Sequence, residues 1–416
     1  MDFERASIEK IRNKKAKIGI VGVGYVGTAL MLAALDKDYK VLGFSRSIAK
    51  VRKLNRLGDK KFRATNDFSK LASCDIICIC VPTPIHEDKT PYLGPLDGAL
   101  EKVATYLQKG QLIIIESSIG VGMTRKIALK TLEAKTKLRA GIDFFLAYSP
   151  ERVDPGNNKF SFKNIPKVVA GLDDTSKRLA TNFYKNIVNR VVPVSSLEVA
   201  EMSKLLENTF RLVNISFINE LANYTKAVGI DIWEVVDAAS SKPFGFLPHY
   251  PGPGVGGHCI PVDPYYLLHD ARKRNIKLSL VEEAGRINDE QTEKVVKRAV
   301  EILKETNGEN KPHRILLIGL AYKPDVSDVR ESAALKILSK LQRLGFSVSY
   351  HDPHIPHING IASKELTENV LDKHDLIIII TNHSTIDYAT LLKCQKPILD
   401  TRNVLKYLAN PHVFHI

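Results

Sequence analysis

A short apolar segment followed by three spaced glycines constrains the fold of this 416-residue chain more than any other feature. Residues 17–30 read Lys-Ile-Gly-Ile-Val-Gly-Val-Gly-Tyr-Val-Gly-Thr-Ala-Leu, which is typical of a buried strand that turns through Gly22, Gly24 and Gly27 into a helix. Glycines at this spacing permit a tight turn and let a pyrophosphate approach the amides at the helix N-terminus. The pattern therefore predicts a dinucleotide-binding strand-turn-helix unit.

Further apolar runs extend this unit into a sheet. They lie at residues 40–45, 75–81, 111–116 and 143–148. Segments of helical character separate them, and this alternation predicts a doubly wound sheet. A second series lies at residues 313–319, 347–352, 375–381 and 397–400. We therefore expect an α/β chain with two Rossmann-like domains, and because the second lacks the three glycines, we expect it to bind a different nucleotide group.

The stretch between the two series differs in kind. Residues 195–227 contain no proline or glycine, Ser195 or Ser196 can cap the start, and Gly229 marks the end. The pattern predicts one long helix that joins the domains and supplies the face of a homodimer. The predicted domains are a dinucleotide-binding Rossmann domain, a central helical domain and a second Rossmann-like domain for a different nucleotide group, at residues 1–196, 197–300 and 301–416.

Composition excludes several classes of protein. A hydrophobic content of 44% and a charged content of 25% are ordinary for a globular chain, and no apolar run approaches the ~20 residues that span a bilayer. The five cysteines are odd in number and lie mostly in apolar runs, which favours the reducing cytoplasm over a disulfide framework. The net charge of +14 is scattered along the chain, so we expect a phosphorylated or nucleotide-linked small substrate and no nucleic-acid or membrane partner.

One cysteine lies in a loop with few side chains. Residues 251–264 read Pro-Gly-Pro-Gly-Val-Gly-Gly-His-Cys-Ile-Pro-Val-Asp-Pro, so Cys259 follows four closely spaced glycines and Asp263 follows Cys259. Glycines let a substrate approach the backbone closely, and a thiolate near an acid or base is the nucleophile of covalent catalysis at sulfur. A buried structural cysteine is the alternative. His258, Cys259 and Asp263 are not spaced as a metal site, so we expect no metal.

Three polar residues share one face of the long predicted helix. Lys204, Asn208 and Arg211 stand at positions i, i+4 and i+7 among apolar neighbours. A solvated polar face explains such a pattern about equally well. A lysine and an amide held in an apolar setting can, however, stabilise an alkoxide or oxyanion.

Together these segments resemble the UDP-glucose/GDP-mannose dehydrogenase family. The resemblance rests, in order, on residues 22–27, 149–156, 201–211, 251–264 and 319–332. It extends over nearly the whole chain. The sequence of residues 242–264 most resembles that of the UDP-N-acetylglucosamine 6-dehydrogenases, and next that of the UDP-N-acetylmannosamine enzymes.

The resemblance implies that the C6 hydroxymethyl of a UDP-N-acetylhexosamine is oxidised to a carboxylate with two NAD molecules, through a thiohemiacetal and a thioester on Cys259. UDP-GlcNAc is the first expected substrate, with UDP-ManNAc or UDP-glucose as alternatives. The resemblance implies that residues 1–196 are the NAD(P)-binding domain and residues 301–416 the UDP-sugar-binding domain. Lys204 and Asp263 are expected to handle the proton and the water, Asn208 to hold the oxyanion, and Glu151 to act as acid or base.

The site residues that the resemblance implies fall into three groups. The catalytic group is Cys259, Lys204, Asp263, Asn208, Glu151 and Ser118. The cofactor contacts are Gly22, Gly24, Tyr25, Val26, Gly27, Ser45, Arg46, Pro82, Thr83, Ser118 and Arg330. The substrate contacts are Glu151, Arg152, Val153, Lys204, Asn208, Arg211, Lys242, Tyr250, Gly252, Gly256 and Lys323.

The chain departs from the family pattern at three places. Ser45 and Arg46 stand where an acid usually binds the ribose 2′-hydroxyl, so we expect a weakened preference for NAD or the use of NADP. Ser118 stands where the family usually has threonine. Pro155 replaces a second glutamate of the UDP-glucose enzymes, which leaves the acid-base role to Glu151 or Asp154.

Two other classes of function remain open from the sequence. A single-step β-hydroxyacid or 6-phosphogluconate-type dehydrogenase also joins a Rossmann domain to helices that carry a lysine and an asparagine, but it needs no cysteine. A nucleotide- or nucleic-acid-binding protein without catalysis would use the basic charge alone. A single-step dehydrogenase would give one reduced cofactor per product, whereas the two-step oxidation gives two. A nucleic-acid-binding protein would show salt-sensitive binding to random DNA.

Overall fold

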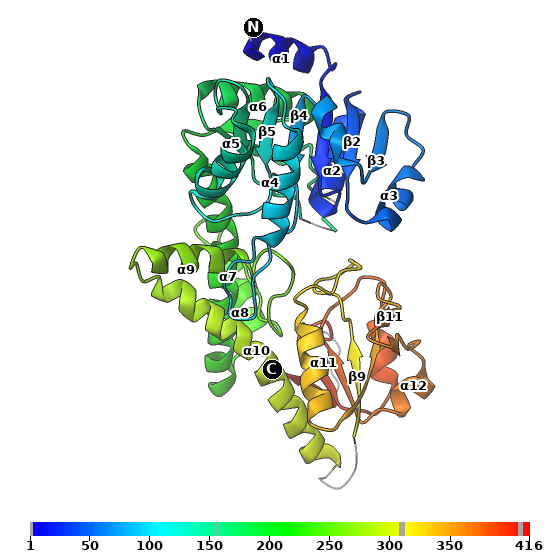
Figure 1. Ribbon diagram of the computed structural model, residues 1–416. Helices are drawn as coiled ribbons and strands as arrows, with labels where there is room; N and C mark the ends of the chain where they lie inside the picture. The colour runs from blue at the N-terminus through cyan, green and yellow to red at the C-terminus, as the bar shows by residue number, and fades with distance from the viewer. Residues whose placement is uncertain (1–2, 155, 158, 308–312, 407–410) are drawn as a thin grey trace. The chain divides into compact units, whose positions relative to one another are not determined.

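The computed structural model describes residues 3–416 except 155, 158, 308–312 and 407–410 (Figure 1). Its contacts divide the chain into two compact units. Unit 1 comprises Met1–Glu207 and Tyr265–Ile276, and unit 2 comprises Asn208–Pro264 and Lys277–Ile416. Each unit contains one large sheet with helices on its faces, so the predicted α/β class with two Rossmann-like sheets is confirmed.

The sheet of unit 1 has the strand order β3-β2-β1-β4-β5-β6-β7-β8, and neighbours run parallel except β6 and β7. The strands are β1 (Lys17–Val21), β2 (Lys40–Phe44), β3 (Phe62–Thr65), β4 (Ile76–Ile79), β5 (Leu112–Ile115), β6 (Phe145–Tyr148), β7 (Lys167–Gly171) and β8 (Val191–Pro193). The order reverses between β1 and β4. In open parallel sheets this switch point is where nucleotides bind.

Both faces of this sheet are buried at its centre because strands β4, β5 and β6 are apolar at every position. Cys78 of β4 and Ile114 of β5 pack into one core cluster, whereas Ile77 and Ile113 pack into another. The helices that contribute to these faces or flank them are α1 (Phe3–Arg12), α2 (Tyr25–Asp36), α3 (Ile48–Asn55), η1 (Phe68–Ser73), α4 (Gly94–Tyr106), the π-helix η2 (Thr124–Leu129), α5 (Lys130–Thr136) and α6 (Asp174–Ile187).

The sheet of unit 2 is parallel throughout, with the order β10-β9-β13-β14-β15. Its strands are β9 (Arg314–Ile318), β10 (Ser347–His351), β13 (Leu376–Ile379), β14 (Ile398–Asp400) and β15 (Val413–His415), beside a small hairpin of β11 (His357–Ile358) and β12 (Ile361–Ala362). Leu317 and Leu316 of β9 again pack into different clusters, so this sheet also buries both faces.

The long helix predicted for residues 195–227 is α7 (Leu197–Ala227), which crosses from unit 1 into unit 2 and is followed by Gly229 with φ 74°. The remaining helices are α8 (Ile232–Ser240), α9 (Asp263–Lys273), α10 (Ser279–Asn307), α11 (Ala333–Arg343), α12 (Glu368–Asp372) and η3 (Tyr388–Lys393). Within the described residues, none of these helices combines the length and the hydropathy needed to cross a bilayer.

Candidate active site

The glycine turn after β1 leaves an open approach to the start of α2. Gly22 has φ 94°, and a Cβ added there would lie 2.7 Å from the carbonyl oxygen of Cys80. A Cβ at Gly27 would collide with the Gly22 carbonyl. A Cβ at Gly24, in contrast, meets no atom within 4 Å. Gly22 and Gly27 are therefore needed for the turn itself, whereas Gly24 keeps space beside the helix N-terminus, where a pyrophosphate fits.

The residues after β2 and β4 complete the edge of this sheet. Ser45 follows β2, and its Oγ accepts the Ser47 N–H at 3.2 Å, while Arg46 is exposed. The Thr83 hydroxyl donates to the Ser118 carbonyl at 2.6 Å, so the loops after β4 and β5 are joined. Pro82, beside Thr83, is exposed. The predicted cofactor residues of unit 1 thus gather at the carboxyl ends of β1, β2, β4 and β5.

Glu151 is held by a buried lysine that the sequence analysis did not identify. Its Oε2 accepts from Lys167 Nζ at 2.6 Å, and its Oε1 accepts the N–H groups of Arg152 and Val153 at 2.8 and 2.7 Å. Lys167 Nζ also donates to Glu116 Oε2 at 2.9 Å. Burial acts to lower the pKa of Lys167, but the charges of Glu116 and Glu151 outweigh it and raise the pKa, so the lysine stays charged.

The start of α7 is fixed to the loop after β5. Glu201 accepts the Thr124 N–H at 2.8 Å and the Thr124 hydroxyl at 2.6 Å. Burial raises the pKa of Glu201 to about 6, although these hydrogen bonds oppose the shift. Lys204, one turn further along α7, is buried. Arg152 forms an ion pair of 2.7 Å with Glu207 on the same helix, so the Glu151 segment is anchored to α7.

Cys259 in unit 2 lies next to a hydrogen-bonded amide and carboxylate. Asn208 Nδ2 donates to Asp263 Oδ2 at 2.6 Å, and both side chains are buried. The Asp263 N–H donates to the Cys259 carbonyl at 2.8 Å, which closes the turn between the cysteine and α9. Cys259 itself is partly exposed. A partly exposed cysteine therefore lies one turn of backbone from a fixed carboxylate.

Cys259 is the one cysteine of the five that is not buried. Burial raises the pKa of Cys74 to about 12, and it raises the pKa values of Cys78 and Cys80 well above the usual thiol value. Cys394 is buried as well, and burial raises its pKa. All five cysteines lie in the described residues and none forms a disulfide, so only Cys259 is placed to act as a nucleophile.

The glycines before Cys259 let the loop pack against the segment that follows β9. A Cβ at Gly256 would lie 2.7 Å from the Glu331 carbonyl, and one at Gly257 would lie 2.8 Å from the Tyr322 ring. The Gly257 N–H donates to the Arg330 carbonyl at 3.0 Å. The Arg330 guanidinium pairs with Asp328 and interacts electrostatically with Cys259. Within unit 2, Arg330 is therefore a cation close enough to Cys259 to interact with it, although its main partner is the Asp328 carboxylate.

The predicted substrate residues of unit 2 have different environments. The Tyr250 hydroxyl donates to Asp237 at 2.7 Å and its ring stacks on Trp233, whereas Lys242 is exposed with its ammonium over the Phe244 ring. Lys323 is partly buried in the loop after β9. Arg211 is exposed on α7, unlike Asn208.

A second residue that the sequence analysis missed lies against Gly252. The Gly252 N–H donates to Asn219 Oδ1 at 2.9 Å, and a Cβ at this glycine would lie 2.6 Å from Arg402 Nη1. Arg402 Nε donates to the Ile380 carbonyl at 2.7 Å, and desolvation lowers the pKa of Arg402 to about 10. A guanidinium beside the glycine loop is suited to a phosphate or a uracil carbonyl.

The candidate residues thus form one group in each unit. Unit 1 brings the glycine turn, Ser45, Thr83 and Ser118 to one sheet edge, with Glu151 on the neighbouring strand end. Unit 2 brings Cys259, Asp263, Asn208 and Arg330 together, with Gly252 and Gly256 in the same loop. Lys204 belongs to unit 1. Asp154 is partly buried, and Pro155 lies outside the described residues.

Comparison with known proteins gives matches along nearly the whole chain. Models of the UDP-glucose/GDP-mannose dehydrogenase family match as an NAD binding domain (56–188), a central domain (198–290) and a UDP binding domain (316–407). The chain is 32% identical to a UDP-N-acetyl-D-mannosamine dehydrogenase of Pyrococcus horikoshii, over 94% of this chain and 96% of the relative. It is 33% identical to a UDP-N-acetyl-D-glucosamine 6-dehydrogenase of Pseudomonas aeruginosa, over 89% and 91%. A solved structure titled as the P. horikoshii UDP-D-ManNAc dehydrogenase gives a TM-score of 0.86 at 31% identity and covers 96% of this chain and 98% of its own.

Proposed function

Since the chain belongs to the UDP-glucose/GDP-mannose dehydrogenase family and is a UDP-sugar dehydrogenase, we propose that it oxidises the C6 hydroxymethyl of a UDP-N-acetylhexosamine to a carboxylate. The observation that carries the proposal is the accessible Cys259, beside the buried Asn208–Asp263 pair and the cation of Arg330. The sequence of residues 242–264 favours UDP-GlcNAc as the substrate. The relatives named above are dehydrogenases of UDP-GlcNAc or UDP-ManNAc.

Cys259 makes a four-electron oxidation possible at one site. The thiolate adds to the C6 aldehyde left by the first oxidation, and the resulting thiohemiacetal loses a second hydride to give a thioester. Water then cleaves the C–S bond, which releases the acid and restores the thiol. Bound NAD(P) supplies the hydride acceptor for both oxidations. The balance is therefore one hydroxymethyl, two oxidised cofactors and one water for each acid.

The other polar residues are proposed to transfer protons, stabilise charge and bind the nucleotide. Glu151 is held by Lys167 and two backbone amides, so its carboxylate has a fixed direction in which to accept a proton from the hydrolytic water. Asp263, oriented by Asn208, is the second base, and Lys204 supplies the positive charge that steadies an alkoxide. Lys323 and Arg402 are proposed to bind the nucleotide, because both cations lie in the unit that contains the UDP-binding domain.

The glycine turn of unit 1 fits a dinucleotide, since Gly24 leaves space beside the N-terminus of α2. The family model over this unit is an NAD binding domain. Ser45 and the exposed Arg46 stand where a ribose 2′-phosphate would bind, so we propose that NADP is also accepted. We further propose that α7 forms the face of a homodimer and that the enzyme works in the cytoplasm.

A substrate panel tests the proposal directly. The purified protein is incubated with UDP-GlcNAc, UDP-ManNAc or UDP-glucose and with NAD or NADP, and reduced cofactor is counted for each acid formed. We expect two per acid, fastest with a UDP-N-acetylhexosamine. The Cys259→Ser variant should form no acid, whereas Cys394→Ser, a change of the same kind at a buried site, should retain the ratio of two. One reduced cofactor per product would point to the single-step alternative.

A further inference from the structure

The topology of the second sheet brings three loops with metal-binding side chains to one edge. β10, β9 and β13 are parallel neighbours, so the loops that follow them emerge side by side. Asp325 lies in the loop after β9, His354 in the loop after β10, and His383 in the loop after β13. These positions are far apart in sequence, and no local motif joins them.

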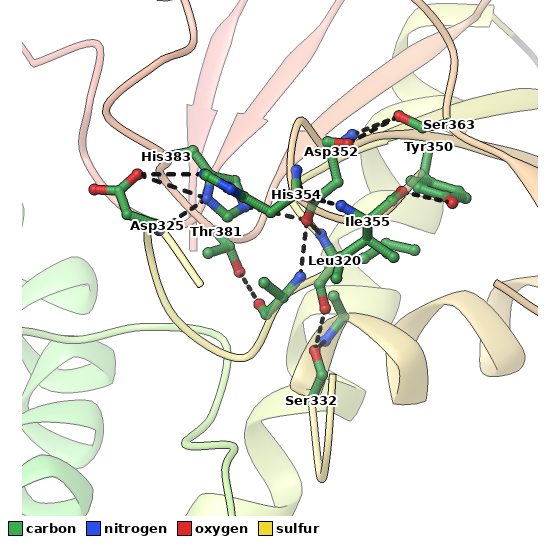
Figure 2. A network of polar contacts seen from close by, with 12 residues as sticks. Leu320, Asp325, Ser332, Tyr350, Asp352, His354, Ile355, Ser363, Thr381 and His383 are labelled. Carbon is green, nitrogen blue, oxygen red and sulfur yellow. Dashed lines mark hydrogen bonds and ion pairs between the residues drawn. The ribbon is translucent and has the colours of Figure 1, made fainter. Parts of the chain in front are cut away.

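The donor atoms of these three side chains converge, as Figure 2 shows. Asp325 Oδ1 lies 3.8 Å from His354 Nε2 and 3.8 Å from His383 Nδ1, and all three donor atoms lie within 4.8 Å of one another. His354 Nε2 is buried and has no hydrogen-bond partner among the described residues. A buried ring nitrogen without a hydrogen-bond partner costs folding free energy, and a ligand bound at this cluster would offset that cost.

A neighbouring carboxylate sets the tautomer of His383. Asp352 Oδ2 lies 3.1 Å from His383 Nε2 and also accepts the N–H groups of Leu320 and Ala321 at 2.6 and 2.9 Å. An ionised carboxylate can only accept hydrogen bonds. His383 Nε2, which faces Asp352, therefore carries the hydrogen, and His383 Nδ1 carries the lone pair. Carboxylate–histidine pairs of this kind orient metal ligands in proteins.

The lone pair of His383 Nδ1 has a partner that a cation can replace. The Asp325 N–H donates to this nitrogen at 3.0 Å. Asp325 is exposed, so its amide can turn to water when the ring nitrogen coordinates an ion. Ligand atoms of a tetrahedral zinc site with bonds of ~2.0–2.1 Å lie roughly 3.4 Å apart, so the two Asp325 distances must shorten by about 0.4 Å and the distance between the two histidine nitrogens by at most about 1.4 Å.

We propose that Asp325, His354 and His383 bind one divalent transition-metal ion of the zinc class. Two imidazoles and one carboxylate match the preference of zinc, cobalt(II) and nickel(II), and three protein ligands leave a position for water or a phosphate oxygen. The ion joins the loop that contains Lys323 and Arg330 to the loops after β10 and β13. The site therefore adds order to the segment beside the Cys259 loop, and its existence does not depend on the sugar that the enzyme oxidises.

The test uses cobalt(II) as a probe on chelator-treated full-length protein. The background carries Cys259→Ser, because a thiolate is a competing metal ligand. We expect a visible cobalt absorption band at one ion per chain, its loss on addition of zinc, and a zinc-dependent rise in the unfolding temperature. His354→Gln should weaken zinc binding at least tenfold, and Asp352→Asn should weaken it by about 10–100-fold.

The matched control is His357→Gln, which changes an exposed histidine on the same segment as His354. It should bind cobalt and zinc like the background protein. Equal zinc affinity in the His354→Gln and His357→Gln proteins would overturn the proposal, and so would the absence of a cobalt band in the background protein. Because the readouts are absorption, stoichiometry and thermal stability, failure here leaves the proposed oxidation intact, and failure of the oxidation leaves this site intact.

Discussion

The turn after β1 in unit 1 and the turn after β9 in unit 2 begin with the same backbone conformation but differ in the residues that follow. Gly22 follows β1 with φ 94° and donates its N–H to the Phe44 carbonyl of β2, while Gly319 follows β9 with φ 83° and donates to the His351 carbonyl of β10. After Gly22 the helix α2 begins almost at once, at Tyr25. After Gly319 a long loop precedes α11, which begins at Ala333 with Ser332 as its cap.

The difference extends to the next strand. The residue after β10 is Asp352, and its carboxylate accepts the amides of Leu320 and Ala321 in the second turn. The residue at the equivalent place after β2 is Ser45, whose hydroxyl accepts the N–H of Ser47, the N-cap residue of α3. The second turn therefore fills its anion position with its own side chain, whereas the first keeps space for a ligand. The same fold thus gives one open turn and one internally occupied turn.

The largest expected effect comes from the two leading glycines, since a Cβ there meets a carbonyl oxygen at positive φ. Gly319→Ala should destabilise unit 2 by about 3 kcal/mol, and Gly22→Ala should do the same to unit 1. The chain has one tryptophan, Trp233 in unit 2, so its fluorescence reports that unit. The Trp233 unfolding transition should shift in Gly319→Ala and stay unchanged in Gly22→Ala. A shift in both would show that the turns are not independent.

The internal anion of the second turn has the next largest effect. Although burial opposes the shift, hydrogen bonds from His383 and from backbone amides lower the pKa of Asp352 from 3.8 to about 2. Ionised Asp352 therefore contributes about 2.5 kcal/mol of stability at neutral pH. Asp352→Asn should lower the midpoint of the Trp233 transition in urea, measured with a chelator present.

The sign of the pH dependence follows from the lowered pKa. The contribution of Asp352 is complete above its unfolded value near 3.8 and is lost as the pH falls through about 2. The stability difference between the parent protein and Asp352→Asn should therefore shrink between these pH values. A difference that stays constant down to the lower value would contradict this origin of the stability.

The open turn lacks the acid that the second turn has at Asp352, and substitution of Ser45 can supply it. Ser45→Asp should accept a hydrogen bond from the ribose 2′-hydroxyl and repel a 2′-phosphate, which should raise the kcat/KM ratio of NAD to NADP by about 10–100-fold. Ser45→Asn has the same size without the charge and should change the ratio much less. Equal ratios in the two variants would remove Ser45 from the account of cofactor choice.

The smallest effect on stability is expected at Gly24, where an added Cβ meets nothing within 4 Å. Gly24→Ala should change the unfolding free energy by less than about 1 kcal/mol and yet raise the KM for cofactor, because the methyl group occupies ligand space. Gly98→Ala is the matched control, since its Cβ also meets nothing and it lies within a different helix, α4. Unchanged cofactor KM in Gly24→Ala would show that this space is not used.

The elements that the sequence predicted well have strong local signals. β1, β4 and β13 are runs of apolar residues, and α7 has no helix breaker and is followed by a glycine at positive φ. Cys259, Asp263 and Asn208 could be proposed as site residues from the sequence because a motif surrounds each of them.

The residues that the sequence analysis missed act across strands and loops. Lys167 is the first residue of β7. Its role as the partner of Glu151 becomes visible only after β6 and β7 pair in the folded sheet. Arg402 follows β14 and meets Gly252 through the fold of unit 2. Charges that are satisfied by long-range partners leave no periodicity in the sequence, so their roles emerge only from tertiary structure.

The central claim is that Cys259 holds the oxidised sugar, and a mass measurement tests it most directly. Glu151→Gln enzyme, in which hydrolysis is slowed, is mixed with UDP-GlcNAc and oxidised cofactor, quenched in acid and weighed intact and after digestion. The account predicts a covalent sugar adduct on the peptide that contains Cys259, and no adduct when Cys259→Ser is added to the same variant. An enzyme that forms the acid without any adduct on this peptide, or that forms it equally well with serine at position 259, would contradict the account.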